Sequence, residues 1–374
     1  HLKSIHYILI SDNRMPNSEA KYAALKPRRI LLVKLRHHGD MVLTTPVINR
    51  LRQHYPDAEI DVLLYKETRP ILSEHPALSH IHVIDRSWKK QGIRYQLQQE
   101  YQLLKAIRAR HYDLVINLAD QWRSALLALF SGAKIRLGFD YKKRRSLIWR
   151  TGHTQLVTTE NHSILHTVEQ NMSILSPLGV STENAQTSMH YSESDKAFCQ
   201  QLLLKNQVAG DYIVIQPTSR WTFKCWDDDK FASVIDGLGD TGLTIVMTAG
   251  PDKKELDMVR KIQDLTHNTQ VISVAGQLSL TQLAAMIDGA KLFIGVDSAP
   301  MHMAAALNTP CVALFGPTKM QHWRPWGHNN TTLWAGDYAP LPSPDSIDTK
   351  TQQRYLHAIP VSDVIDAARS YLND

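Results

Sequence analysis

A short polar segment, R-H-H-G-D, follows the first apolar run of the chain and ends at Asp40. The apolar run, residues 30–35, is typical of a buried strand, and an amphipathic helical pattern follows the polar segment. A carboxylate held there can accept a proton as a general base, although an Asp that caps the helix would suit the same position. Gly39 gives the backbone freedom to turn. His37 and His38 are alternative bases, because imidazole titrates near neutral pH.

Two polar loops in the second half of the chain carry groups that suit a phosphate. The first contains Lys224, a mobile cation, and the hydroxyls of Thr218 and Ser219, which can donate to phosphate oxygens. The second, G-V-D-S-A-P-M-H, joins an apolar run to an alanine-rich helix whose free N–H groups attract anions. The residues of this second loop that could meet the anion are Asp297, Ser298, Ala299 and His302. The alternative for the first loop is a solvated loop in which Trp221 and Trp226 pack, and in the second loop His302 could simply pack.

Motifs of several other protein classes are missing from the sequence. Neither half has G-x-G-x-x-G after a strand and no G-x-x-x-x-G-K-[ST] occurs, which disfavours dinucleotide-dependent dehydrogenases and P-loop NTPases. No D-x-D motif directly follows a predicted strand, so we expect neither a metal ion nor a cofactor. The three cysteines lie far apart, which predicts free thiols rather than a zinc site or disulfides.

The formal net charge of +6 predicts an anionic partner. The densest basic run consists of Lys142, Lys143, Arg144 and Arg145. This run is either a solvated loop or a contact for phosphorylated sugars or anionic lipid headgroups. Nucleic acid is disfavoured as the partner, because no basic strand interleaved with aromatic residues and no known binding module occurs.

The elements that must position these loops alternate between strands and helices. In the first half we predict strands at residues 30–35, 59–64, 81–84, 113–118 and 135–138, and helices at 41–54, 95–108, 122–130 and 162–175. In the second half we predict strands at residues 212–216, 243–248, 271–274, 292–294 and 311–315, and helices at 227–238, 253–265, 281–288, 299–307 and 362–372. This alternation predicts an α/β protein with two Rossmann-like domains, whose parallel sheets bind ligands beyond the carboxyl ends of the strands.

The pattern also suggests domain boundaries. Residues 1–26 are a weakly patterned N-terminal extension that is compatible with disorder, and residues 27–180 form the first domain. A polar linker at 181–192 leads to the second domain at 193–360, and a helix at 361–374 ends the chain. No apolar run approaches the roughly 18 residues that a spanning helix needs, so we expect a cytoplasmic protein.

Taken together, the motifs resemble the ADP-heptose:lipopolysaccharide heptosyltransferases, glycosyltransferase family 9. The resemblance covers nearly the whole chain after residue 27. Within the family, the sequence is most similar to the members that add the side-branch heptose to the second inner-core heptose. The motifs that carry it are Lys34-x5-Asp40, L-T-T-P from Leu43, Lys224-x-Trp226, G-V-D-S-A-P-M-H from Gly295 and A-L-F-G-P-T from Ala313.

The resemblance implies a GT-B fold of two facing Rossmann-like domains, with the acceptor on the N-terminal domain and the donor on the C-terminal one. It implies inversion at the anomeric carbon without a metal ion. It also implies that Asp40 is the catalytic base and that Lys224 binds the donor diphosphate. The further donor contacts that it implies are Thr218, Ser219, Asp297, Ser298, Ala299 and His302, with Glu255 on the ribose.

The implied partners are ADP-heptose, the lipopolysaccharide inner core and the cytoplasmic face of the inner membrane, with the basic run at residues 142–145 toward the acceptor. Both substrates must be held between the domains, so closure about the linker is expected. One alternative is a member of the same family that acts at another core position. The other is a GT-B-like protein that binds a nucleotide sugar without transferring it.

Overall fold

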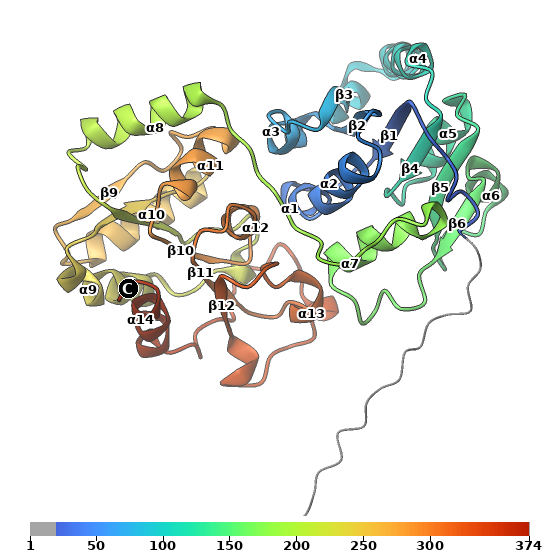
Figure 1. The fold of residues 1–374 in the computed structure, drawn as a ribbon. Coiled ribbons are helices and arrows are strands. Elements are labelled where there is room, and N and C mark those ends of the chain that lie inside the picture. Colours follow the sequence, from blue (N-terminus) through green and yellow to red (C-terminus); the bar gives the residue numbers. More distant parts are fainter. Residues whose placement is uncertain (1–19, 374) are drawn as a thin grey trace, which may run out of the picture.

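The computed structural model describes residues 20–373, which form two α/β halves that face each other (Figure 1). The sheet of the N-terminal half has six parallel strands in the order β3-β2-β1-β4-β5-β6. These strands are β1 Arg29–Val33, β2 Glu59–Tyr65, β3 Leu78–Ile84, β4 Leu114–Asn117, β5 Ile135–Asp140 and β6 Gln155–Thr158. Because helices cover both faces, the central strands are almost wholly apolar, as in R-I-L-L-V of β1.

The helices of this half form two layers. The face toward the C-terminal half carries α1 His38–Val42, α2 Thr45–His54, α3 Arg69–Leu72 and α7 Thr167–Met172. The opposite face carries α4 Ile93–Ala109, α5 Trp122–Phe130 and α6 Leu147–Gly152.

The C-terminal half repeats the plan with a second sheet of six parallel strands, in the order β12-β11-β10-β7-β8-β9. Its strands are β7 Tyr212–Gln216, β8 Thr244–Met247, β9 Val271–Ser273, β10 Leu292–Val296, β11 Cys311–Phe315 and β12 Asn330–Trp334. Its helices are α8 Glu193–Lys205, α9 Asp228–Gly237, α10 Lys253–Leu265, α11 Leu280–Asp288, α12 Ala299–Ala306, α13 Met320–Trp323 and α14 Val361–Ser370. The predicted pair of parallel sheets in an α/β fold is therefore confirmed.

Three buried apolar clusters form the core. One lies between the N-terminal sheet and α4 and α5, and includes Leu103 and Ile107. A second lies on the outer side of the C-terminal sheet and includes Val364 and Ala368 of α14, which therefore packs on this half. The third and largest cluster contains residues of both halves, such as Met41 and Met301, so the facing sides share one core.

The predicted helix at residues 41–54 was wrong in one respect, because it is two helices. Helix α1 begins at His38, and α2 begins at Thr45 with Pro46 in its first turn. Proline has no N–H, and its ring clashes with the carbonyl four residues earlier, so a continuous helix is broken here. The Thr44 hydroxyl donates to the Asp40 carbonyl at 2.8 Å across the break.

The prediction of one helix over residues 162–175 was also wrong. Only Thr167–Met172 is α-helical, and a 3₁₀ segment with Pro177 inside it follows at Ser173–Leu178. Strand β6, which precedes it, was missed because Q-L-V-T is a short edge strand with a single buried residue, Val157.

Helix α8 was missed as well, although the sequence held a signal for it. The Ser192 hydroxyl accepts from the backbone N–H of Asp195 at 3.1 Å, and the Asp195 carboxylate accepts from the backbone N–H of Ser192 at 2.9 Å. This S-x-x-D capping box marks the first turn of a helix.

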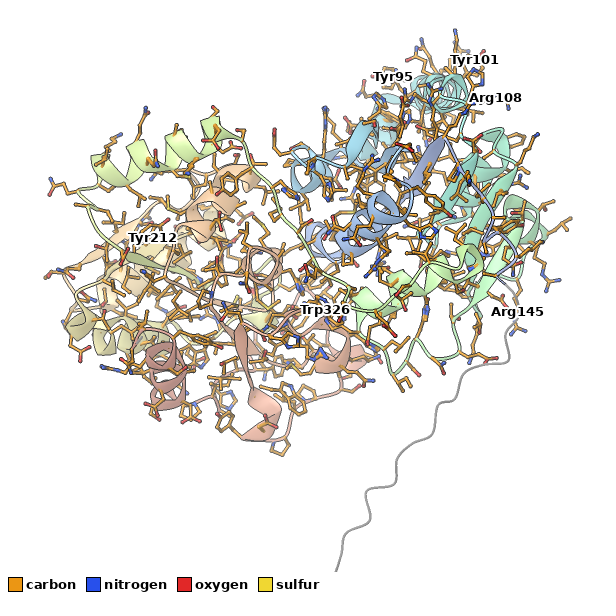
Figure 2. The ribbon with its side chains drawn as sticks, viewed as in Figure 1. Tyr95, Tyr101, Arg108, Arg145, Tyr212 and Trp326 are labelled. Carbon is orange, nitrogen blue, oxygen red and sulfur yellow. The ribbon has the colours of Figure 1, made fainter. Side chains whose placement is uncertain are left out.

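Residues 181–192, the predicted linker, contact both halves. The side-chain amide of Asn49 donates to the Gln186 carbonyl at 3.0 Å, and the indole N–H of Trp326 donates to the Ala185 carbonyl at 2.7 Å (Figure 2). Of the predicted extension, residues 1–19 lie outside the described residues, and the Tyr22 N–H donates to the Pro177 carbonyl at 2.8 Å. Within the described part of the chain, no helix has the length and apolarity needed to cross a membrane.

Candidate active site

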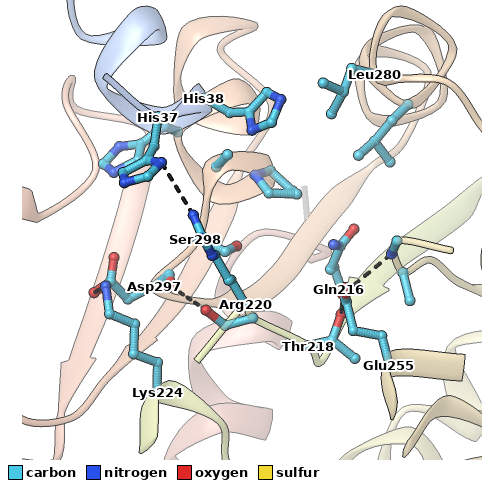
Figure 3. Close-up of a pocket in the computed structure, with 18 of the residues that line it drawn as sticks. His37, His38, Gln216, Thr218, Arg220, Lys224, Glu255, Leu280, Asp297 and Ser298 are labelled. Atoms are coloured by element: carbon cyan, nitrogen blue, oxygen red, sulfur yellow. Dashed lines mark hydrogen bonds and ion pairs between the residues drawn. The ribbon is translucent and has the colours of Figure 1, made fainter. Parts of the chain in front are cut away.

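A cavity of about 520 Å³ opens between the two halves, where the carboxyl ends of β1, β7, β8 and β10 meet (Figure 3). The three polar loops singled out from the sequence all line it, as does the first turn of α10. The predicted site residues that the cavity brings together are Asp40, Thr218, Ser219, Lys224, Glu255, Asp297, Ser298, Ala299 and His302. The strand ends of two parallel sheets thus converge on one space, as the topology requires.

Asp40 is the third residue of α1 and does not cap the helix. The N-cap position belongs to His37, which makes no side-chain cap hydrogen bond, so the capping interpretation of Asp40 was wrong. Asp40 is 8% exposed, and its Oδ1 lies 3.8 Å from Nε of Arg36. The carboxylate is therefore almost enclosed and lies against the cavity.

Gly39 allows two helices to approach each other closely and does not form a turn. Its backbone is part of α1 and has no positive φ, so the expected freedom to turn is not used. A Cβ added at this position would lie 3.2 Å from Cδ2 of His302. The absence of a side chain lets α1 approach α12 across the boundary between the halves.

A second, smaller cavity of about 160 Å³ adjoins the first on the side of the N-terminal half. Its lining is polar and includes Lys34, Asp120 and Asn171. Asp40 and Arg36 line both cavities. A base that must lie between two substrates needs this placement, with one substrate on each side of the carboxylate.

Lys224 and Asp297 form an ion pair inside the larger cavity (Figure 3). Lys224 Nζ lies 2.7 Å from Oδ2 of Asp297, and the Thr318 hydroxyl donates to the same oxygen at 2.9 Å. The lysine side chain is 17% exposed and the aspartate side chain 6%. Asp297 therefore fixes the ammonium group where a diphosphate could meet it, and as an anion it is itself a poor phosphate ligand.

The N-terminus of α12 faces the same cavity without a side-chain cap. Ser298 is the N-cap residue, but its hydroxyl donates to the Val296 carbonyl at 3.0 Å and caps nothing. Pro300 lies in the first turn and has no N–H. The first N–H groups of α12, including that of Ala299, are not capped by any side chain of residues 20–373 and can bind an anion.

His302 both packs against α1 and lines the cavity, so the two interpretations of this residue are compatible. Burial lowers the pKa of His302 to about 4, while the charge of Asp297 acts in the opposite direction. The imidazole is therefore neutral near pH 7. Its Nδ1 atom is buried and has no hydrogen-bond partner within residues 20–373.

The hydroxyls of Thr218 and Ser219 are already engaged within the protein. Thr218 donates to Oε1 of Glu255 at 2.5 Å, and Ser219 donates to the Asp297 carbonyl at 3.3 Å. Since a hydroxyl has one proton to donate, neither is a free donor to phosphate in this arrangement, contrary to the expectation from the loop. Glu255 is held by Thr218 and by the backbone N–H of Gly250 at 3.3 Å.

Arg36, Arg220 and Trp323 also line the larger cavity, and the sequence analysis assigned them no role. Nη1 of Arg220 lies 3.2 Å from Nδ1 of His37, a contact that spans the two halves (Figure 3). Burial lowers the pKa of His37, and the Arg220 charge adds to this effect. Arg36 directly follows its predicted strand and Arg220 lies in the loop after its own, and a cation at such a position was a signal for an anion site.

The basic run lies in the loop after β5 and lines neither cavity. Lys143 forms an ion pair with Asp120, and Nε of Arg144 donates to the Asp120 carbonyl at 2.5 Å. Lys142, Lys143 and Arg145 are exposed, and Arg144 is half-buried. Because Asp120 lines the smaller cavity, the run borders that cavity from outside.

No group of three or more His, Cys, Asp or Glu that could hold a metal ion occurs among the described residues. The three cysteines, Cys199, Cys225 and Cys311, are free thiols and are buried, as the sequence predicted.

Comparison with solved structures confirms the GT-B architecture of two facing Rossmann-like domains. A glycosyl transferase of family 9 from Veillonella parvula superposes with a TM-score of 0.79 at 24% identity, covering 92% of this chain and 97% of that one. The ADP-heptose lipopolysaccharide heptosyltransferase II of Escherichia coli superposes with a TM-score of 0.74 at 21% identity, covering 92% and 98%.

Sequence comparison identifies the family. The chain is 44% identical to lipopolysaccharide heptosyltransferase 3 of Escherichia coli over 338 residues, which are 90% of this chain and 97% of that protein. It is 25% identical to lipopolysaccharide heptosyltransferase 1 of Escherichia coli K12, over 78% of this chain and 88% of that one. The family model of glycosyltransferase family 9 (heptosyltransferase) matches residues 100–353. The chain belongs to this family of heptosyltransferases.

Proposed function

We propose that this protein is an inverting glycosyltransferase that transfers heptose from ADP-heptose to a heptose of the lipopolysaccharide inner core. The observation that carries the proposal is the placement of Asp40 at the junction of the large cavity between the two halves and the smaller one on the side of the N-terminal half. The identity of 44% to a heptosyltransferase 3, against 25% to a heptosyltransferase 1, favours the side-branch heptose as the product.

In the proposed reaction, Asp40 takes the proton from an acceptor hydroxyl held in the smaller cavity. The acceptor oxygen attacks the anomeric carbon of the heptose from the face opposite ADP, and the bond to the diphosphate breaks. Negative charge grows on the diphosphate, where Lys224 and the first N–H groups of α12 stabilise it. Neutral His302 lines the same cavity beside the start of α12, where its ring can contact the bound sugar or diphosphate.

We propose the remaining donor contacts from the positions of the side chains. Glu255, oriented by Thr218, faces the cavity from the first turn of α10 and suits a ribose hydroxyl. Ser298 and Ala299 contribute through the backbone at the start of α12. The acceptor is part of a membrane lipid, so the proposal places the protein at the cytoplasmic face of the inner membrane.

The test is product formation by the purified chain. We expect ADP release and a heptosylated product when ADP-heptose is offered with a core acceptor that carries both inner-core heptoses, detected by mass spectrometry. An acceptor that carries only the first heptose should give no product. Transfer to the shorter acceptor alone would assign the protein to another core position, and ADP binding without any product would identify a binding protein.

The basic run gives a prediction for the acceptor. Changing all four of its residues to Gln should raise the KM for the acceptor and leave the KM for ADP-heptose unchanged. Lys142→Gln with Arg145→Gln, the two exposed members that form no ion pair with a described residue, should alone account for about a thirtyfold rise at low salt, because each cation near an anionic surface contributes about 1 kcal/mol. High salt should weaken the effect, since exposed charges are screened beyond about 8–10 Å near physiological ionic strength.

Steady-state kinetics with both substrates varied checks this prediction. Lys196→Gln with Lys205→Gln, two exposed lysines of α8 in the other half, is the matched control. An acceptor KM that does not move at low salt would establish the run as a solvated loop.

A further inference from the structure

The outward face of the N-terminal half, formed by α4, α5 and α6, is rich in exposed apolar side chains. Thirteen large apolar residues are strongly exposed within the described residues, and eight of them lie on these three helices. The eight are Ile93, Tyr95, Leu97, Tyr101, Trp122, Phe130, Leu147 and Ile148. Scattered apolar residues are normal on a protein surface, but a cluster on one face marks an interaction site.

On α4 the apolar side chains form a stripe. Ile93, Leu97 and Tyr101 are 68%, 61% and 68% exposed and follow one another at intervals of four residues. Residues spaced by four lie on one side of a helix, so the stripe runs for about 12 Å along α4. The residues of α4 that are buried in the core, Leu103 and Ile107, lie further along the helix. We call Ile93, Leu97 and Tyr101 the α4 stripe.

Cations surround the α4 stripe. Lys89, Lys90, Arg94, Lys105 and Arg108 are all exposed. The first four form no ion pair or side-chain hydrogen bond with any residue from 20 to 373, while Arg108 donates to the Phe130 carbonyl. The acidic residue of this segment, Glu100, forms an ion pair with Arg123 of α5. An apolar stripe beside unpaired lysines and arginines is the pattern of a helix that lies in the surface of an anionic bilayer.

The position of the stripe in the fold suits such a surface. All strands of the sheet are parallel, so a helix that follows a strand begins at the carboxyl edge, where Asp40 lies. Ile93, Leu97, Trp122 and Leu147 all lie in the first two turns of their helices, and therefore toward that edge, while Tyr101 lies at the middle of α4. The face points away from the C-terminal half, and Tyr95, Tyr101 and Arg108 project outward from it (Figures 1 and 2).

We propose that the α4 stripe and its surrounding cations dock this protein on an anionic lipid bilayer. The proposal rests on the proposed function, because an acceptor anchored in a membrane requires an enzyme that works at its surface. The charge selects a bilayer over a second copy of this chain: in a symmetric dimer through this face, the same cations would oppose one another. The aromatic and aliphatic side chains would enter the headgroup region, and the cations would meet lipid phosphates.

The experiment is sedimentation of the full-length chain with vesicles of phosphatidylcholine alone or with phosphatidylglycerol added. We expect binding to the anionic vesicles only. A stripe variant, Ile93→Gln with Leu97→Gln and Tyr101→Gln, should bind at least tenfold more weakly, and Gln preserves the helix because it is a good helix former. A charge variant, with Gln at positions 89, 90, 94 and 105, should bind several hundredfold more weakly, at about fivefold per cation.

The control variant carries Leu204→Gln, Lys196→Gln and Lys205→Gln on α8, where Leu204 is 69% exposed, and should bind as the unchanged chain does. Circular dichroism checks folding, and turnover of a lipid-free core acceptor should be the same in all variants. The proposal is overturned if the unchanged chain does not bind anionic vesicles, or if the stripe and charge variants bind them as well as the unchanged chain does. It is also overturned if light scattering shows that the unchanged chain is a dimer and that the variants are monomers. If the vesicles bind as expected but no acceptor receives heptose, the proposed function is contradicted, and the proposal that this surface binds a bilayer is not.

Discussion

Replacing Asp40 by Asn should lower turnover by about 10²–10⁴-fold, the usual contribution of a general base, and leave the affinity for ADP nearly unchanged. Asn has almost the same shape as Asp but cannot take the proton of the attacking hydroxyl. The side chain borders the donor cavity without contacting Lys224 or Asp297 through any hydrogen bond or ion pair of the described residues. Single-turnover kinetics and calorimetry with ADP measure the two quantities separately.

Loss of folding does not explain such a result. Asp40 is not the N-cap of α1, and a carboxylate in the first turn of a helix contributes only about 0.3–1 kcal/mol through the helix dipole. The matched variant is Asp120→Asn, which changes the other carboxylate of the smaller cavity. If Asp120→Asn abolished turnover and Asp40→Asn retained it, the base would have to be reassigned. A variant at Asp40 that unfolds but keeps its specific activity would likewise exclude a catalytic role.

Many of the residues that line the site could be predicted from the sequence, because their positions depend on local signals. An apolar run followed by polar residues marks the carboxyl end of a buried parallel strand, and such ends meet at one edge of a sheet. This rule predicts that Lys224 and Asp297 lie at one edge of the same sheet, and the resemblance to family 9 implied that Asp40 faces them from the other half; all three line one cavity. Strands with strongly apolar sequences, such as C-V-A-L-F of β11, were predicted at their observed bounds for the same reason.

The detailed contacts could not be predicted because they depend on partners distant in the chain. Nothing near Thr218 shows that its proton goes to Glu255, 37 positions later. The contact between Arg220 and His37 exists only because the two halves meet. Gly39 was interpreted as a turn residue. A small residue is needed there because His302 of the facing helix lies close to it. The first of these features is fixed by the fold of the C-terminal half, and the other two by the packing of one half against the other.

Replacing Lys224 by Ala should weaken ADP binding by about 10–100-fold and lower the single-turnover rate further. A hydrogen bond to a charged group is worth about 1.5–3 kcal/mol, which sets the effect on affinity. The charge on the diphosphate grows as the bond to heptose breaks, so the lysine stabilises the transition state more than the bound donor. The substitution also leaves Asp297 with the Thr318 hydroxyl as its partner, and its negative charge then faces the diphosphate.

The double variant Lys224→Ala with Asp297→Asn separates these two causes. If Asp297 repels the diphosphate once the lysine is gone, the double variant should bind ADP more tightly than Lys224→Ala alone, and the two substitutions should be strongly non-additive. Lys253→Ala, which removes a lysine whose side chain is 88% exposed at the start of α10, should change neither affinity nor rate. ADP binding by Lys224→Ala at the level of the unchanged chain would remove this lysine from the donor site. A loss of affinity with no further loss of rate would show that it serves binding alone, because only an interaction that strengthens in the transition state accelerates the chemical step.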